Sequence, residues 1–371
     1  MTNITRLFEE CAAIAREHAV KVDAQGSFPE EAIAALAQRG LLGLLSATDV
    51  GGLGQGLRQA AHGVRLLAQA CASTAMVTCM HYSATAVIEK HGPKTVREAI
   101  AKGAHLSTLA FSEVGSRSQF WAPVSSARRD GNDVVLDAEK SFVTSASRAT
   151  AYVWSSRPLE GEGASTLWLV PRAANGLQVA RPFDGLGLRG NDSAPVTARG
   201  TRVAESARLG DEGGGFGVMM GIVLPFFNVM NAATSVGLMQ EATRLVAAHA
   251  GRTKFENQGS ALCDLPTIRA QIAKMQVRTD MAFALWQDTL DAIEGGRPEA
   301  QLRVLESKAA CNDAANEVLD VALRVTGGAG YRKDLPIERL FRDARAGSVM
   351  GPTADVLYEF IGRAVTGLPL F

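Results

Sequence analysis

The sequence shows no excess of either sign of charge. Its 371 residues include 38 Lys and Arg and 38 Asp and Glu, so the formal net charge is +0. A nucleic-acid-binding protein usually carries a basic excess or a basic stripe, and the basic clusters here, such as Arg128-Arg129, are isolated. We therefore expect no nucleic-acid partner.

Cysteine pairs are also missing. The 5 cysteines are an odd number and are scattered, and no Cys-x-x-Cys pair or paired His/Cys spacing occurs. This pattern supports neither a zinc site nor a disulfide framework, so we expect no bound metal and a reducing compartment. The Gly-x-Ser-x-Gly elbow that marks one class of serine hydrolases is absent as well.

Targeting and membrane signals are not evident either. The first twenty residues are amphipathic and contain acidic residues, unlike a secretory or mitochondrial signal. We see no run of about 18 apolar residues, the length that a membrane-spanning helix requires. The sequence therefore predicts a cytoplasmic protein without a membrane span.

Three zones of different pattern follow one another along the chain. Residues 1–107 have helical periodicity and predict an N-terminal all-helical domain. The string Ser27-Phe28-Pro29-Glu30 has the pattern of a capping box, and Gly40 is placed to end the helix that follows it. Further helices are expected near 58–72, 74–91 and 94–101.

The middle zone, residues 108–209, changes to short β-rich runs. These runs are separated by turn signals such as Asp130-Gly131-Asn132. Their spacing predicts a small antiparallel sheet or barrel. Helices do not alternate with the strands, which argues against a Rossmann domain. The runs cover 134–136, 142–144, 152–154, 166–170 and 195–198.

Helical periodicity returns in residues 210–371. Long segments near 216–252, 264–294 and 299–325, with a last helix from about 353, predict a four-helix bundle of antiparallel helices. A glycine-rich break at 327–330 interrupts it. The predicted fold class is thus mainly α, with a central β domain between two helical domains.

Several strings, taken together and in order, resemble the acyl-CoA dehydrogenase family. The resemblance covers nearly the whole chain, and it implies the same helix–sheet–helix layout. The strings are FPEEAIAALAQRGLLGLLSATDVGGLG (28–54), AFSEVGSRS (110–118), EKSFVTSAS (139–147), GLRGNDSAPV (187–196), RVTGGAGY (324–331) and ERLFRDARAGSVMGPT (338–353).

The resemblance implies a bound FAD between the middle sheet and the helical bundle, with the flavin accepting electrons. By motif position, Phe142, Val143 and Thr144 lie along the flavin, Thr144 near its reactive nitrogen, and Ser112 contacts the pyrimidine end. The other implied cofactor contacts are Arg252 and Phe255, which reach the cofactor of a neighbouring subunit, Gly327 and Gly328 at the pyrophosphate, Arg324 in the place of a glutamine, and Thr353. A shared cofactor also implies a homo-oligomer, a dimer or a tetramer.

The chain departs from the family at the catalytic base. In the family a glutamate removes the α-proton of an acyl thioester, but Gly351 stands at its usual position here and Phe227 at a known alternative position. A carbon acid needs a base within hydrogen-bonding reach, and neither residue provides one. The backbone N–H of Gly351 can still polarise a thioester carbonyl. Asp355, four residues further on, and His81, if its helix faces the flavin, are the candidate displaced bases.

A second departure lies in the glycine-rich turn of the middle domain. Arg117 stands where a glycine is frequent, and with the adjacent Ser118 it is a candidate substrate contact. Arg117 either binds a phosphate of CoA or of a carrier arm, or only caps a solvated loop.

Three functions remain open, of which we favour the first. The protein desaturates an acyl thioester of CoA or a carrier, with a displaced base and an electron-transfer flavoprotein as partner. Alternatively, it is a monooxygenase of the same fold that takes reduced flavin from a reductase and activates O₂, with His81 beside the flavin. The third function is a non-catalytic scaffold that binds flavin or an acyl thioester.

Overall fold

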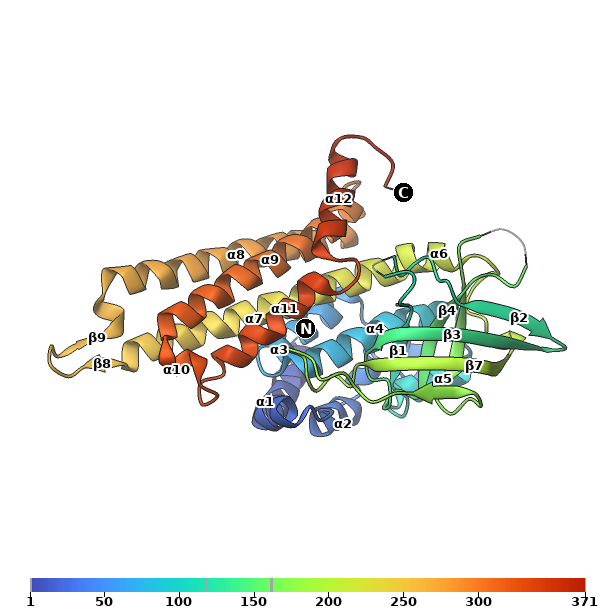
Figure 1. Cartoon of the computed structure of the whole chain (residues 1–371), viewed down its shortest axis with the longest axis horizontal. Coiled ribbons are helices and arrows are strands. Elements are labelled where there is room, and N and C mark those ends of the chain that lie inside the picture. Colours follow the sequence, from blue (N-terminus) through green and yellow to red (C-terminus); the bar gives the residue numbers. More distant parts are fainter. Residues whose placement is uncertain (1, 118, 161–162, 371) are drawn as a thin grey trace.

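The chain folds into helices, then two small sheets, then helices again (Figure 1). The computed structural model describes residues 2–117, 119–160 and 163–370. This order confirms the fold class expected from the sequence. The first helices are α1 (Thr2–Gln25), α2 (Glu30–Gln38), α3 (Leu57–Ala68), α4 (Ala72–His91) and α5 (Lys94–Ala101).

Helix α2 ends as predicted but begins differently. Gly40 follows its last turn with φ 71°, a left-handed conformation that glycine adopts without steric cost. The predicted capping box does not form, because the N-cap is Pro29 and no side chain caps the helix. The N–H of Ser27 instead donates to the carbonyl of Val22 at the end of α1.

Helix α4 is buried on nearly every face. Its sequence mixes small apolar and hydroxyl residues around the whole circumference, a pattern of a helix surrounded by other elements. It packs against α3, α7 and β1, and it contributes residues to both the largest helical core and the core beneath the first sheet. Helix α4 therefore joins the N-terminal helices, the sheet and the bundle.

The middle part contains a three-stranded and a four-stranded sheet. The first has the order β1-β4-β5, and β1 runs parallel to β4, which corrects the expectation of purely antiparallel strands. The parallel pair is possible because the chain crosses to the other sheet between β1 and β4. The second sheet has the order β2-β3-β7-β6 and is antiparallel throughout.

The strands differ from the predicted runs in number and length. The run 134–136 and residues 142 and 143 of the next run belong to one strand, β3, whose pairing with β7 is interrupted at two irregularities. Two strands, β2 and β6, lack an apolar pattern because they are short edge strands. The bounds are β1 (Ser107–Ala110), β2 (Ser126–Asp130), β3 (Asp133–Val143), β4 (Ala151–Ser156), β5 (Thr166–Pro171), β6 (Leu177–Val179) and β7 (Ala194–Ala204).

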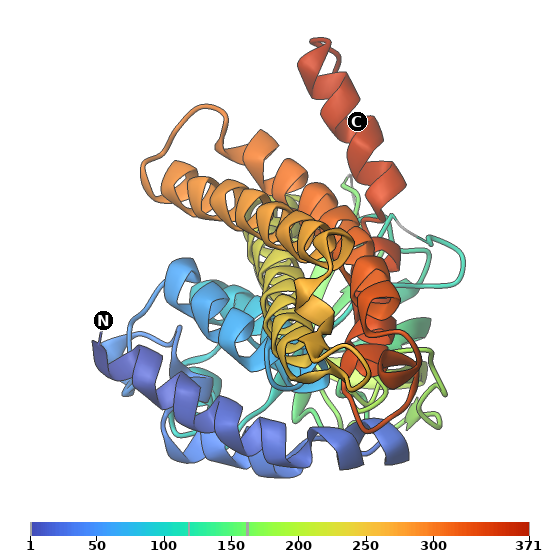
Figure 2. The ribbon, with the colours of Figure 1, turned by 90° about the vertical axis from the view of Figure 1, so that its left-hand side faces the viewer.

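The last part is a bundle in which α7, α8, α9 and α11 pack together. Seen from the end of the molecule that carries β8, β9 and α10, the final helix α12 packs against α9 and projects outward from the bundle (Figure 2). The elements are α6 (Gly215–Val218), a π-helical turn (Met219–Val223), α7 (Leu224–Arg252), β8 (Lys254–Phe255), β9 (Ser260–Ala261), α8 (Pro266–Glu294), α9 (Ala300–Thr326), α10 (Gly328–Tyr331), α11 (Ile337–Val349) and α12 (Ala354–Val365).

One helical stretch, Gly215–Arg252, is long and apolar enough to cross a membrane by length and composition alone. Its most apolar window has a mean hydropathy of 1.6, and 56% of that window is buried inside the fold. The stretch ends in α7, the helix that α3, α4, α8, α9 and α11 surround. Packing inside the bundle accounts for its apolar character.

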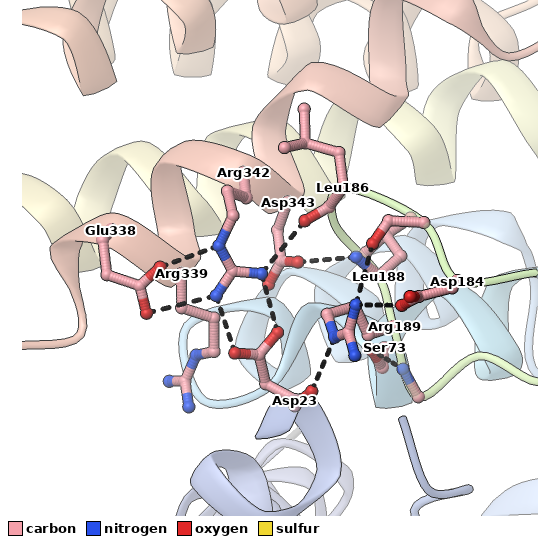
Figure 3. A network of polar contacts seen from close by, with 12 residues as sticks. Asp23, Ser73, Asp184, Leu186, Leu188, Arg189, Glu338, Arg339, Arg342 and Asp343 are labelled. Carbon is pink, nitrogen blue, oxygen red and sulfur yellow. Dashed lines mark hydrogen bonds and ion pairs between the residues drawn. The ribbon is translucent and has the colours of Figure 1, made fainter. Parts of the chain in front are cut away.

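A network of ion pairs joins the three parts of the fold (Figure 3). The guanidinium of Arg342 in α11 makes two hydrogen bonds to the carboxylate of Asp23 in α1, at 2.8 and 2.6 Å, and donates to the carbonyl of Leu186 in the middle part. The neighbouring Asp343 accepts the N–H of Leu188 at 2.7 Å. These contacts fix the 184–190 loop between the first and last parts of the chain.

We expect Arg342→Met to lower the free energy of unfolding by about 2–3 kcal/mol, because it leaves the mostly buried Asp23 carboxylate without its cation. Arg345→Met in the same helix is the matched control: its ion-pair partner Asp320 is 63% exposed, so the pair contributes less than about 1 kcal/mol. Urea unfolding of both variants measures the difference. Equal stability of the two would contradict this role for Arg342.

Candidate functional site

Two segments that the resemblance assigns to the flavin lie side by side. The N–H of Ser141 donates to the carbonyl of Ser112 at 2.8 Å, and Glu113 forms an isolated bridge with Lys140. Strand β1 leads into the first segment and β3 ends in the second, which continues to Thr144. These backbone contacts between the two sheets therefore bring Ser112 next to the 142–144 segment, although about thirty positions separate them in the sequence.

Phe142 presents an exposed aromatic ring at this place. Phe142 is 67% exposed, whereas the next two residues, Val143 and Thr144, are buried. The Phe142 ring stacks on Phe183 at 4.4 Å between centroids. Phe142 also has a φ of 51°, which is uncommon for a residue with a side chain. The local backbone thus keeps an aromatic face outside the core.

A buried ion pair holds these segments to the sheet. The Lys140 ammonium donates to Glu113 at 2.5 Å and to the carbonyl of Ser155 at 2.7 Å, and Glu113 also accepts the N–H groups of Val124 and Ser125. Burial lowers the pKa of Lys140 to about 8, so it stays charged at neutral pH. Burial opposes ionisation of Glu113, but the Lys140 charge and its hydrogen bonds hold its pKa below the ordinary value.

A second group of predicted cofactor residues lies at the far end of the bundle. Arg252 ends α7, Phe255 lies in β8, Arg324 lies in the last turn of α9, and Gly327 and Gly328 follow it. Figure 1 shows β8 and α10 toward one end of the long axis and β3 toward the opposite end. The fold therefore does not bring the two groups together within one chain.

The local chemistry of both groups fits FAD, which carries a flat aromatic ring and a pyrophosphate. The exposed Phe142 ring offers an aromatic face, and the adjacent Ser112 and Thr144 bear hydroxyls. At Gly327 and Gly328 a Cβ would meet no atom within 4 Å, so the backbone is open to an approaching ligand. Gly327 also has a φ of 52°, which favours glycine.

The turn between α11 and α12 carries the predicted carbonyl-binding N–H of Gly351. This residue is partly exposed, and within the described residues no hydrogen bond is found from its N–H. Thr353 is the N-cap of α12, where its hydroxyl accepts the N–H of Val356. The turn thus keeps one backbone donor that can bind a ligand.

Lys308 of α9 lies directly beneath this turn. Its ammonium donates to the carbonyls of Gly347, Met350 and Pro352 at 3.4, 3.0 and 2.6 Å. The side chain is fully buried, and among the ion pairs of the described residues none involves Lys308. Burial lowers its pKa to about 7, while hydrogen bonds to the carbonyls favour the charged form.

The alternative base position is apolar, as the sequence indicates. Phe227 is buried, and its ring centroid lies 5.8 Å from the Lys308 nitrogen. The next residue, Asn228, is fully buried, and neither polar atom of its amide has a hydrogen-bond partner among the described residues. No carboxylate side chain is therefore supplied by Gly351 or Phe227.

His81 does not fit the role of a base, which corrects one expectation. It is fully buried, its Nε2 lies 2.9 Å from the carbonyl of Leu42, and its Nδ1 accepts the N–H of Ser107 at 3.0 Å. Burial lowers the pKa of His81 to about 4. Both nitrogens are occupied by backbone groups, so the neutral ring connects α4 to β1 and to the loop after α2.

The remaining candidates lie at the surface. Asp355 is exposed in the first turn of α12. Arg117 is exposed with a φ of 48°, a conformation that glycine adopts more easily. Ser118 lies outside the described residues. The roles of Asp355 and Arg117 stay predictions.

The two buried lysines were not predicted from the sequence. Lys308 occurs at helical spacing among Leu305, Ala309 and Asn312, so a charged residue on an otherwise buried face was the available signal. Lys140 follows an exposed Glu139 at the inward-facing position of β3, where alternation calls for an apolar residue.

Comparisons with known proteins agree over the whole chain. Models of the acyl-CoA dehydrogenase N-terminal, middle and C-terminal domains match residues 6–104, 108–200 and 213–366. Acryloyl-CoA reductase (NADH) of Anaerotignum propionicum is 27% identical to this chain, and the matched region covers 94% of this chain and 89% of the reductase. Human mitochondrial short-chain specific acyl-CoA dehydrogenase is also 27% identical, covering 91% and 83%.

Solved structures show the same fold at lower identity. Butyryl-CoA dehydrogenase from Megasphaera elsdenii superposes with a TM-score of 0.90 at 21% identity, covering 99% of both chains. The prolyl acyl carrier protein oxidase AnaB superposes with a TM-score of 0.88 at 18% identity, covering 98% of this chain and 99% of its own.

We expect Lys140→Met to lower the free energy of unfolding by about 3–5 kcal/mol, because Glu113 is then a buried charge without its partner. The double variant Lys140→Met with Glu113→Gln should recover most of this loss, since it buries no charge and the Gln carbonyl still accepts from Val124 and Ser125. Urea unfolding of the single and double variants checks the expectation. A double variant no more stable than Lys140→Met would contradict it.

Proposed function

Because the chain belongs to the acyl-CoA dehydrogenase family, whose members are FAD enzymes acting on the CH–CH bonds of acyl-CoA, we propose that this chain desaturates an acyl thioester between its α and β carbons. The observation that carries the proposal is the N–H of Gly351, which lies in a partly exposed turn and has no hydrogen-bond partner among the described residues. A thioester carbonyl that accepts this hydrogen bond is polarised, which acidifies the α-proton.

Each group of residues has a distinct task in this reaction. Phe142, Thr144 and Ser112 hold the flavin ring against the middle sheet, and Gly351 holds the thioester carbonyl. When bound, FAD takes up the hydride lost from the β-carbon. The α-proton passes to a base, and a carbon–carbon double bond forms. Asp355, four residues beyond Gly351 in the first turn of α12, is our candidate for this base.

The thioester is carried by CoA or by a carrier protein. Arg117 is the candidate contact for a phosphate of either carrier, because its exposed guanidinium presents several donors that match phosphate oxygens. An electron-transfer flavoprotein is the proposed partner that reoxidises the flavin. A cytoplasmic location is likewise a proposal.

The decisive measurement is anaerobic bleaching of the flavin. We expect the yellow protein to lose the visible absorbance of its oxidised flavin on addition of one member of a panel of acyl-CoA and carrier-bound thioesters. Bleaching only with a flavin reductase, followed by substrate-dependent O₂ uptake, would instead assign a monooxygenase. Absence of flavin binding, even with added FAD, would leave a scaffold.

Replacing Gly351 by glutamate tests whether a carboxylate at this position can act as the missing catalytic base. A general base contributes about 10²–10⁴-fold, so Gly351→Glu should accelerate exchange of the thioester α-proton in D₂O by at least about tenfold. Gly351→Ala, which adds a side chain without a base, is the matched control.

In parallel, Asp355→Asn should slow flavin reduction by about 10²-fold. A less than threefold change in Asp355→Asn removes that residue as the base.

We also propose that the chain assembles as a dimer or tetramer, because its two groups of cofactor residues lie apart. Helix α8 carries a stripe of exposed small and apolar residues that faces away from the bundle and suits a second copy. The stripe consists of Ala270, Ala273, Val277, Met281 and Ala284, of which Val277 and Met281 are 56% and 57% exposed.

Charge placed in this stripe should weaken the assembly. We expect Val277→Asp to shift the mass measured by light scattering toward the monomer, because a carboxylate would be buried against an apolar partner. Gln276→Asp adds the same charge one residue away, outside the stripe, and should leave the mass unchanged. A Val277→Asp variant with wild-type mass would show that the subunits meet elsewhere.

A further inference from the structure

The Gly351 N–H belongs to the same peptide unit as the carbonyl of Met350. In a trans peptide these two groups point in opposite directions, and among the described residues the only cis peptide is Gly351–Pro352. The Met350 carbonyl points into the fold, where it accepts from the Lys308 ammonium at 3.0 Å. The N–H of Gly351 is therefore directed away from Lys308.

Lys308 also binds carbonyl groups that precede and follow this peptide in the chain. Its ammonium also donates to the carbonyl of Pro352, the residue after Gly351, at 2.6 Å, and more weakly to the carbonyl of Gly347 in the last turn of α11. Three acceptors use all three N–H groups of an ammonium. Rotation of the Met350–Gly351 peptide would break the bond from Lys308 to the Met350 carbonyl.

From these contacts we infer that Lys308 is a positioning residue that orients and polarises the Met350–Gly351 peptide, so that the Gly351 N–H becomes a strong, prealigned donor for the substrate carbonyl. The inference rests on the proposed function, because it assigns a role in that reaction to a residue that does not touch the substrate.

Electrostatics supports the inferred polarisation of the Met350–Gly351 peptide by Lys308. A cation at one end of a peptide unit withdraws electron density from its carbonyl and strengthens the N–H at the other end as a donor. Lys308 is fully buried and the Phe227 ring lies 5.8 Å away, so the charge is poorly screened by water. Cys79 is the titratable group that couples to it from α4, and burial raises the pKa of Cys79 to about 12, so this thiol is neutral. Among the described residues Lys308 has carbonyl acceptors and no ion-pair partner, so no bound anion cancels the charge of its protonated form.

The test compares Lys308→Met, which lacks both donors and charge, with Lys308→Gln, which keeps donors without charge. Lys102→Met, which changes an exposed lysine, is the control. We expect the rate of anaerobic flavin reduction at saturating thioester to fall about 10- to 100-fold in Lys308→Met and less in Lys308→Gln. The half-saturating thioester concentration should change less than about threefold.

A second readout is independent of turnover. The carbonyl stretching frequency of a ¹³C=O-labelled, non-oxidisable thioester measures the hydrogen bond from Gly351 directly. Binding to the wild type should lower this frequency, and binding to Lys308→Gln should lower it less. Lys308→Gln carries the test if Lys308→Met does not fold. A folded, flavin-loaded variant with the wild-type rate and wild-type frequency would overturn the inference.

Failure of the proposed function gives a different result. If no thioester reduces the wild-type flavin, the proposed reaction is wrong, and amide hydrogen exchange then decides whether Lys308 holds the turn. The N–H groups of Met350 and Leu357, which donate to Ala346 and Thr353, should exchange at least about tenfold faster in Lys308→Gln than in the wild type or Lys102→Met. Unchanged exchange would overturn the positioning role as well.

Discussion

The near-complete burial of helix α4 fixes the relative positions of everything else. The N-terminal helices, the first sheet and the bundle all cover it, so no part can shift without exposing apolar surface. Its polar residues fix the helix further: His81 bonds to Leu42 and Ser107, and the hydroxyl of Tyr82 donates to the carbonyl of Leu41. Because Ser107 begins β1, this helix also fixes where the chain reaches Ser112.

Two buried lysines then fix the two sides of the candidate site, by different means. Lys140 neutralises Glu113 and thereby ties the loop after Ser112 to the sheet. Lys308 has carbonyl oxygens instead of a carboxylate, and it ties the Gly351 turn to the bundle. A carboxylate partner would cancel the charge, whereas carbonyls leave its field intact. The carboxylate partner of Lys140 therefore suits a structural role, and the carbonyl partners of Lys308 suit the proposed polarisation of a peptide.

The sequence was informative wherever a property depends on neighbouring residues. It located the helices, the end of α2 at Gly40 and the adjoining zones of the middle part, because periodicity and turn chemistry are local. It could not show that β1 pairs in parallel with β4, nor that backbone groups of Leu42 and Ser107 occupy both nitrogens of His81, because these partners are distant in the chain. Lys308 was missed for the same reason: its acceptors lie about forty residues further on.

The separation of the cofactor residues into two groups has a genetic consequence. On the proposed shared site, a chain damaged at Thr144 and a chain damaged at Gly327 are defective in different halves. When both chains enter one oligomer, some sites receive two intact halves. Two inactive alleles expressed in one cell would then complement each other, which a site built within a single chain does not allow.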